Sequence, residues 1–295
     1  MNISKFFFKG RAFFLALIVL FALMIGIMFM EKTKDIVGLI PRFRGEVSIG
    51  NGFIITHTKD EQPLIIKKDD PLIGQQLRFL GTVKSVFSDT ITDLCNGNDI
   101  IVEVGSYFGY NSILLGKKLK KEGKIYCLEP NPSIFSCLRK NIVINDLESL
   151  CKLKNIAISS ASGTCNIEDY FSISKLPNGK YTKPPLIKVD CNTLDDEMKD
   201  ETKAINLLTI DVPGLEFLIL DGASKILEHK NIKVVFMFDK KESSKNTDVK
   251  TELNDLHALG FKFYLSKGKN DISPITIDEI MELKTAVLVI SRKQL

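Results

Sequence analysis

The chain has 295 residues, of which 44% are hydrophobic and 26% charged, and its formal net charge is +4 at pH 7. These values are ordinary for a folded protein and exclude a disordered or fibrous chain. No basic run is interleaved with aromatic residues, as nucleic-acid binding surfaces require. We therefore predict that the chain has no nucleic-acid partner.

The stretch 13–30, FFLALIVLFALMIGIMFM, is continuously apolar and has charged residues on both sides. At ~1.5 Å per residue, a helix of this length just crosses a hydrocarbon core of ~30 Å. A cleaved signal peptide has a shorter apolar region with a small-residue cleavage site, and a buried core helix is rarely so uniformly apolar. We expect a single-pass membrane anchor here, preceded by a short tail over residues 1–12.

Residues 31–70 are expected to form a stem with short strands, and apolar spacing predicts a lead-in helix over 71–95. From residue 99 onward, strand and helix patterns alternate. The predicted strands are DIIVEVG (99–105), KIYCLEP (124–130), CKLKNIAIS (151–159), INLLTIDV (205–212), IKVVFMF (232–238), FKFYLS (261–266) and TAVLVIS (285–291). This alternation indicates a mostly parallel α/β sheet with helices on both faces, forming the core 99–295 of a domain over 71–295.

The stretch IVEVGSYFGYN, 101–111, is typical of a strand that enters a tight turn and then a helix. A dinucleotide-binding turn has three glycines spaced G-x-G-x-x-G, whereas Gly105 and Gly109 are spaced G-x-x-x-G. The acid Glu103 disfavours a phosphate ligand and favours an ammonium group. S-adenosyl-L-methionine carries an ammonium and a sulfonium group, so it suits this turn.

Glu129 ends the second predicted strand, and a carboxylate at that position can accept hydrogen bonds from both ribose hydroxyls. Either motif alone is weak, because two spaced glycines and a strand-end acid both occur often. At this spacing and in these strand contexts, the two together indicate a nucleoside cofactor.

Four blocks of the sequence resemble the FkbM-type methyltransferases. They are DIIVEVGSYFGYNSILL, KIYCLEPNPSIFSCLRKNIVIN, KNIAISSASG and LLTIDVPGLEFLILDGASKIL, and the likeness runs from about Asp69 to Phe238. The resemblance implies a class I methyltransferase fold, with a seven-stranded Rossmann-like sheet whose last strand is antiparallel. It also implies O-methylation, with S-adenosyl-L-methionine as cofactor, of a sugar or another small-molecule hydroxyl.

The resemblance also implies which residues form the site. The cofactor-binding candidates are Glu103, Gly105, Ser106, Tyr107, Gly109, Glu129, Pro130, Asn131, Asn155 and Ala157. Asp211 is the first candidate for a catalytic base or hydroxyl-orienting group, and Glu216 is a weaker one. Both acids have a structural alternative at a helix start, where a carboxylate interacts favourably with the helix dipole. The acids around VDCNTLDD, 189–196, read as a strand and turn before a helix, so we predict no metal site.

Two departures from the family pattern bear on activity. The family usually has Ala-Asn at the positions of Ser106 and Tyr107, and an acid at the position of Pro213, which has neither a carboxylate nor an N–H group. The leading hypothesis is a membrane-anchored methyltransferase acting on a small-molecule or glycan acceptor. Its catalytic domain is expected on the cytoplasmic side, where the cofactor is made. The alternative is an inactive, methyltransferase-like binding or scaffold module.

Overall fold

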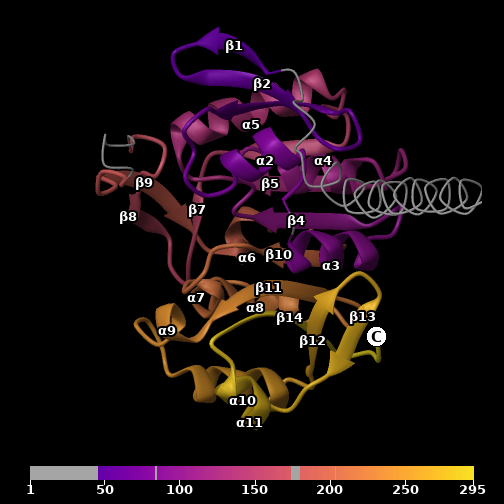
Figure 1. Cartoon of the computed structure of the whole chain (residues 1–295). Coiled ribbons are helices and arrows are strands. Elements are labelled where there is room, and N and C mark those ends of the chain that lie inside the picture. The colour runs from indigo at the N-terminus through magenta and orange to yellow at the C-terminus, as the bar shows by residue number, and fades with distance from the viewer. Residues whose placement is uncertain (1–45, 84, 174–179, 203) are drawn as a thin grey trace, which may run out of the picture. The chain divides into compact units, whose positions relative to one another are not determined.

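The alternating strand and helix patterns build a mixed α/β domain in a computed structural model of the chain, which describes residues 46–83, 85–173, 180–202 and 204–295 (Figure 1). Within these residues, the central sheet has eight strands in the order β13-β12-β14-β11-β10-β4-β5-β6. The strands are β4 (Ile100–Val104), β5 (Lys124–Leu128), β6 (Cys151–Lys154), β10 (Ile205–Ile210), β11 (Lys233–Asp239), β12 (Lys262–Gly268), β13 (Asp271–Pro274) and β14 (Thr285–Ser291).

The direction of the strands confirms most of the expected sheet and corrects its size. β4, β5, β6, β10 and β11 are parallel, and β14 runs antiparallel to both β11 and β12, as expected for the last strand. The sequence predicts seven strands, and the additional one is β13, which pairs with β12 at the edge of the sheet. β13 has four residues, none of them buried, so it lacks the apolar alternation that would reveal a strand.

Helices cover both faces of the sheet because successive strand residues point to opposite sides (Figure 1). In β4, Ile101 belongs to a core that includes Phe87 and Ile113, whereas Val102 belongs to a core that includes Phe217. The helices of the first face are α2 (Gly74–Leu80), α3 (Val86–Leu94), α4 (Tyr110–Gly116) and α5 (Pro132–Ile144). Those of the second are α6 (Leu194–Glu197), α7 (Glu216–Asp221), α8 (Ser224–Leu227), α10 (Val249–Ala258) and α11 (Ile277–Glu282).

Part of the expected stem is a small antiparallel sheet that packs on α5. Its strands are β1 (Val47–Gly50), β2 (Phe53–His57) and β3 (Pro63–Lys67). The buried amide of Asn141 in α5 accepts a hydrogen bond from the Ile65 N–H at 2.7 Å and donates to the Ile65 carbonyl at 2.8 Å. It also donates to the carbonyl of Phe108, just before α4, at 2.8 Å. One side chain thus joins β3, α5 and the loop before α4.

The single lead-in helix expected over 71–95 is two helices. α2 ends at Leu80, and Gly81 follows it with a left-handed φ of 65°, which stops a right-handed helix. α3 then begins after Ser85, whose side chain accepts a hydrogen bond from the backbone of Phe87. The helical spacing of apolar residues continues through the break between α2 and α3, because both helices bury apolar residues against the same face of the sheet.

A second small sheet follows β6. The predicted strand over 151–159 is divided into β6 and β7 (Ala157–Ile158), and β7 pairs with β9 (Leu186–Asn192), which also pairs with β8 (Gly163–Glu168). This sheet carries the segment between β8 and β9, of which residues 174–179 lie outside the described residues.

The predicted membrane placement is corrected here. In the parts of the chain that the structure describes, no helix is long and apolar enough to cross a membrane. α5, for example, has 13 residues and spans about 20 Å, against the ~30 Å of a hydrocarbon core. The stretch 13–30, on which the prediction rested, lies outside the described residues.

Candidate active site

The carboxyl ends of three neighbouring strands bring the sequence-predicted acids to one edge of the central sheet. β4 lies between β5 and β10 and is parallel to both, so the three strands end at the same edge. Glu103 is the penultimate residue of β4, Glu129 directly follows β5, and Asp211 directly follows β10. Open parallel sheets bind ligands at this edge.

The loop after β4 requires glycine at two positions. Gly105 has a φ of 87°, and a Cβ atom there would lie 2.8 Å from the carbonyl oxygen of Asp211. Gly109 has a φ of 85°, and its Cβ atom would lie 2.7 Å from a side-chain carbon of Leu138. Residues with a Cβ atom disfavour such a φ, and at these two positions the Cβ would clash with Asp211 or Leu138. The glycines therefore let the loop turn tightly into α4 while touching the start of the loop after β10.

Glu103 is 2% exposed, and its carboxylate is only half satisfied. Ser112 of α4 donates a hydrogen bond to Oε2, whereas Oε1 has no hydrogen-bond partner among the described residues. Burial raises the pKa of Glu103 to about 7, against hydrogen bonds that lower it, and the nearby Asp211 raises it further. A buried carboxylate with an open oxygen would be stabilised by a cationic group.

Glu129 is held by the backbone on both sides. Its Oε2 accepts a hydrogen bond from the N–H of Tyr107 at 3.0 Å, and its Oε1 accepts one from the N–H of Asn131 at 2.9 Å. Burial raises the pKa of Glu129 to about 7, and these two hydrogen bonds oppose the rise. Each carboxylate oxygen keeps a second lone pair, so the group can still accept a hydroxyl.

The residues around Glu129 form a connected turn. Asn131 caps α5 by accepting hydrogen bonds from Ser133 and Ile134, and its Nδ2 donates to the buried Asp169 at 2.6 Å. Asn155 is exposed, and its Nδ2 donates to the backbone carbonyls of Glu129 at 2.8 Å and Pro130 at 3.0 Å.

Two further cofactor candidates from the sequence are buried. Ser106, in the loop after β4, donates its hydroxyl to the carbonyl of Glu103 at 3.2 Å. Ala157 is buried in β7.

Tyr107 links the loop after β4 to the N-terminal part of the domain. It has a left-handed φ of 51°, and its hydroxyl donates a hydrogen bond to the carboxylate of Asp70. Asp70 is 1% exposed and also accepts hydrogen bonds from the N–H groups of Ile73 at 2.8 Å and Gly74 at 2.7 Å, at the start of α2.

Sequence reasoning missed two residues of this region, Asp70 and Asp169. Asp70 precedes Pro71, a pattern that marks helix starts and could have drawn attention to it. No comparable pattern marks Asp169, which joins the site through contacts with residues distant in the sequence.

Asp211 is accessible, yet it is surrounded by protein. Its side chain is exposed, and the surrounding protein nevertheless raises its pKa to about 6 by desolvation. The next residues are Val212, the exposed Pro213, and Gly214 with a φ of 89°.

Glu216 differs from Asp211 because it is wholly buried. It is 0% exposed at the start of α7, and Ser243, the last residue of α9 (Lys240–Ser243), donates a hydrogen bond to its Oε1. Its Oε2 has no partner among the described residues, and burial raises its pKa. The structure thus brings Glu103, Glu129 and Asp211 to one edge and places Glu216 in the contact between α7 and α9.

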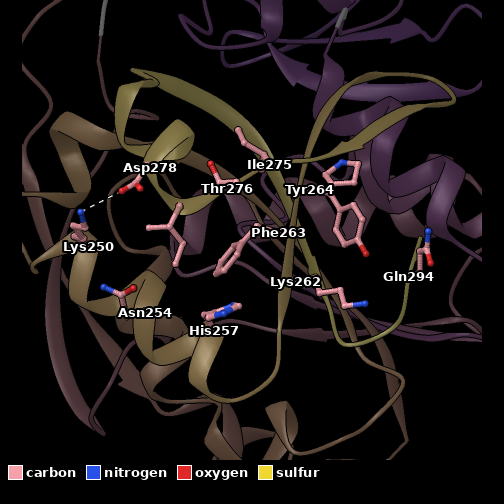
Figure 2. Close-up of a pocket in the computed structure, with 12 residues that line it drawn as sticks. Lys250, Asn254, His257, Lys262, Phe263, Tyr264, Ile275, Thr276, Asp278 and Gln294 are labelled. Atoms are coloured by element: carbon pink, nitrogen blue, oxygen red, sulfur yellow. Dashed lines mark hydrogen bonds and ion pairs between the residues drawn. The ribbon is translucent and has the colours of Figure 1, made fainter.

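A cavity of about 680 Å³ lies elsewhere, between α10, β12 and the segment that leads into α11 (Figure 2). His257 and Phe263 line it with ring centroids 6.5 Å apart, and Lys250 pairs with Asp278 at 3.3 Å. It contains none of the sequence-predicted site residues. Within the described ranges, no three His, Cys, Asp or Glu side chains are grouped so that they could hold a metal ion.

The chain is similar in sequence to known methyltransferases. The sequence model of the methyltransferase FkbM domain matches residues 103–263, more than half of the chain. The methyltransferase sdnD of Sordaria araneosa is 32% identical over a 176-residue alignment, and the match covers 48% of this chain and 68% of that protein.

Two solved structures are similar at lower identity. Methyltransferase FkbM from Methylobacillus flagellatus KT has a TM-score of 0.43 and 14% identity over 66% of this chain and 44% of its own. M. jannaschii TYW2 in complex with AdoMet has a TM-score of 0.43 and 12% identity over 83% of this chain and 86% of its own.

The family match begins at Glu103 in β4, spans β5, β10 and β11, and includes all three strand-end acids. The chain therefore belongs to the FkbM methyltransferase domain family, and its cofactor is S-adenosyl-L-methionine.

Proposed function

We propose that this chain transfers a methyl group from S-adenosyl-L-methionine to a hydroxyl group of a sugar or another small molecule. The observation that carries the proposal is the pair of strand-end acids Glu103 and Asp211. They lie at the carboxyl ends of adjacent parallel strands, both have raised pKa values, and Glu103 has an unpartnered buried oxygen.

The residues present fit the cofactor. An ammonium group next to Glu103 would occupy the open Oε1 and relieve the repulsion between Glu103 and Asp211. Ribose hydroxyls would donate to the remaining lone pairs of Glu129, which backbone N–H groups already orient. Both ends of the cofactor thereby have a partner at the carboxyl edge of the sheet.

The cofactor supplies an activated methyl group, so the protein has to align the acceptor and remove one proton. Asp211 is the proposed base. It is accessible, and with a pKa of about 6 it is mostly ionised near pH 7.5 while being more basic than an ordinary aspartate. Its carboxylate would take the hydroxyl proton as the acceptor oxygen forms its bond to the methyl carbon, while the methyl–sulfur bond breaks and S-adenosylhomocysteine leaves. Glu216 is too deeply buried to contact an acceptor, so we assign it to the contact between α7 and α9.

The acids also favour one class of acceptor. Glu103, Glu129, Asp169 and Asp211 all lie in the candidate site, and none of them forms an ion pair with a basic side chain among the described residues. A phosphate backbone would be repelled there, whereas neutral hydroxyls can donate to carboxylates. We therefore propose a small hydroxylated acceptor in place of nucleic acid.

The test is calorimetric titration of the full chain with S-adenosylhomocysteine, followed by a search for methyl transfer to a panel of sugars by mass spectrometry. We expect micromolar binding and a mass increase of one methyl group on at least one sugar. Failure to bind would defeat the proposed function. Binding without transfer to any sugar would support the inactive scaffold, for which the exposed Pro213 is the structural argument.

A further inference from the structure

The feature that the proposed chemistry leaves unexplained is Tyr107. It is a large residue in a left-handed conformation, which side chains disfavour, in the middle of the proposed cofactor loop. Its backbone N–H donates a hydrogen bond to Glu129, and its hydroxyl donates one to Asp70. A strained backbone persists only where its surroundings hold it in place.

Asp70 is a rigid anchor for that hydroxyl. Its Oδ1 caps the start of α2 through three N–H groups, and its Oδ2 accepts a hydrogen bond from the tyrosine hydroxyl. The site next to it is so tight that a Cβ atom on Gly74 would lie 2.5 Å from the Asp70 Cβ. Burial and the Asp70 carboxylate raise the pKa of Tyr107, so the phenol keeps the proton that it donates.

We infer that Asp70 and Tyr107 are positioning residues that act on the cofactor through Glu129. The Asp70 carboxylate fixes the Tyr107 ring, the fixed ring keeps the residue at positive φ, and this conformation aims the Tyr107 N–H at Glu129 Oε2. The inference rests on the proposed function, because it assumes that Glu129 binds the ribose. It extends the site to the segment before α2, more than thirty residues before Gly105.

The test is Tyr107→Phe in the full chain, which removes only the hydroxyl. S-adenosylhomocysteine and 5′-methylthioadenosine both carry the ribose, and only the first carries the amino-acid end. We expect calorimetry to show both ligands binding about tenfold more weakly, as expected for the loss of one charge-assisted hydrogen bond. In a Glu129→Gln background, Tyr107→Phe should have no further effect, because the two residues act on one contact.

The matched control is Tyr110→Phe. Tyr110 is also buried, and its hydroxyl hydrogen-bonds Thr82 at 2.9 Å, so this variant removes a similar contact that does not lead to Glu129. We expect it to bind both ligands within about twofold of the unmodified chain. Hydrogen exchange should accelerate in residues 105–109 of the Tyr107→Phe variant and stay unchanged there in the control.

Three results would overturn the inference: Tyr107→Phe binding as tightly as the unmodified chain, a loss confined to S-adenosylhomocysteine, or full additivity with Glu129→Gln. Should Tyr107→Phe fail to fold, Asp70→Asn replaces it, since the amide oxygen keeps the α2 cap while the charge is lost. We expect that variant to bind about threefold more weakly, and unchanged affinity would overturn the inference. If the unmodified chain binds neither ligand, the proposed function itself fails.

Discussion

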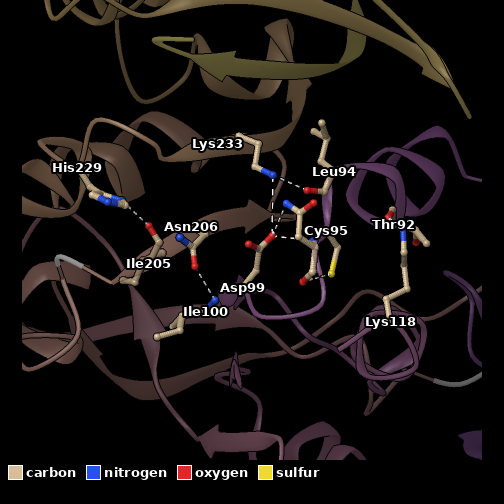
Figure 3. Close-up of polar contacts among 11 residues, drawn as sticks. Thr92, Leu94, Cys95, Asp99, Ile100, Lys118, Ile205, Asn206, His229 and Lys233 are labelled. Carbon is tan, nitrogen blue, oxygen red and sulfur yellow. Dashed lines mark hydrogen bonds and ion pairs between the residues drawn. The ribbon is translucent and has the colours of Figure 1, made fainter. Parts of the chain in front are cut away.

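The two edges of the central sheet handle buried charge in opposite ways. At the amino edge, Asp99 accepts a hydrogen bond from the N–H of Asn96 at 2.8 Å and lies 3.9 Å from the ammonium of Lys233 (Figure 3). Asn206 accepts from the N–H of Ile100 at 2.8 Å. At the carboxyl edge, Glu103 keeps an open oxygen and has another acid, Asp211, as its neighbour.

This difference distinguishes the polar groups of the amino edge, which stabilise the fold, from the acids of the carboxyl edge, which are the proposed ligand-binding groups. Lys233 also donates to the carbonyl of Leu94, so the charges of the amino edge are compensated within the domain. The carboxyl edge leaves its negative charge for something outside the domain to compensate. Buried polar groups are normally satisfied, so the open oxygen of Glu103, at the sheet edge where such folds bind ligands, supports a ligand partner there.

The largest expected effect comes from Asp211→Asn, which changes the carboxyl edge without emptying space. Loss of a general base typically lowers turnover by 10²–10⁴-fold, and we expect a fall of at least about a hundredfold in kcat. Affinity for S-adenosylhomocysteine should change by less than about threefold, because the variant affects the acceptor side. Turnover assays and calorimetry on the same preparation would separate the two effects, and an unchanged kcat would contradict the assignment.

At the amino edge, Asp99→Asn should affect stability and leave the site intact. The change leaves Lys233, whose pKa burial lowers, without its carboxylate, and we expect the free energy of unfolding to fall by about 2 kcal/mol. Urea denaturation measures this loss. Cofactor affinity should stay within about twofold. A large loss of binding with normal stability would break the distinction between the two edges.

The smallest expected effect is on the pH dependence of binding. With a pKa of about 7 in the free protein, Glu103 is mostly protonated at pH 6 and mostly ionised at pH 8. Only the ionised form pairs with an ammonium group, so affinity for S-adenosylhomocysteine should rise by up to about tenfold over this range. Glu103→Gln should bind more weakly at pH 8 and show a flatter profile, since Glu129 still titrates. An equally steep profile in the variant would rule out Glu103 as the titrating group.

Local pattern was enough to predict most of the sheet and the loop after β4. The strand runs are strongly apolar, and the glycines mark turns that only glycine permits, so both signals lie within a few residues. β13 was missed because it is short and lacks buried residues. The break between α2 and α3 depends on the backbone at Gly81, which periodicity does not report.

The candidate site was less predictable wherever it depends on contacts between distant residues. Asp70 meets Tyr107 across 37 positions, and Asp169 meets Asn131 across 38. Glu216 was the weaker catalytic candidate, with a structural alternative at a helix start, and its buried contact is with Ser243, 27 positions later. No spacing rule connects such partners, because the tertiary fold alone brings them together.

Asn141 has a practical consequence for dissecting this protein. Its side-chain amide forms hydrogen bonds with both the N–H and the carbonyl of Ile65 in β3, as a residue of a neighbouring strand would. Truncating the chain to the FkbM match at 103–263 would strip these partners from a side chain that is 0% exposed. The truncated fragment would keep the contact with the Phe108 carbonyl but would lose both bonds to β3, in a damaged core. The shortest fragment worth expressing therefore keeps β3, well before the region that sequence similarity outlines.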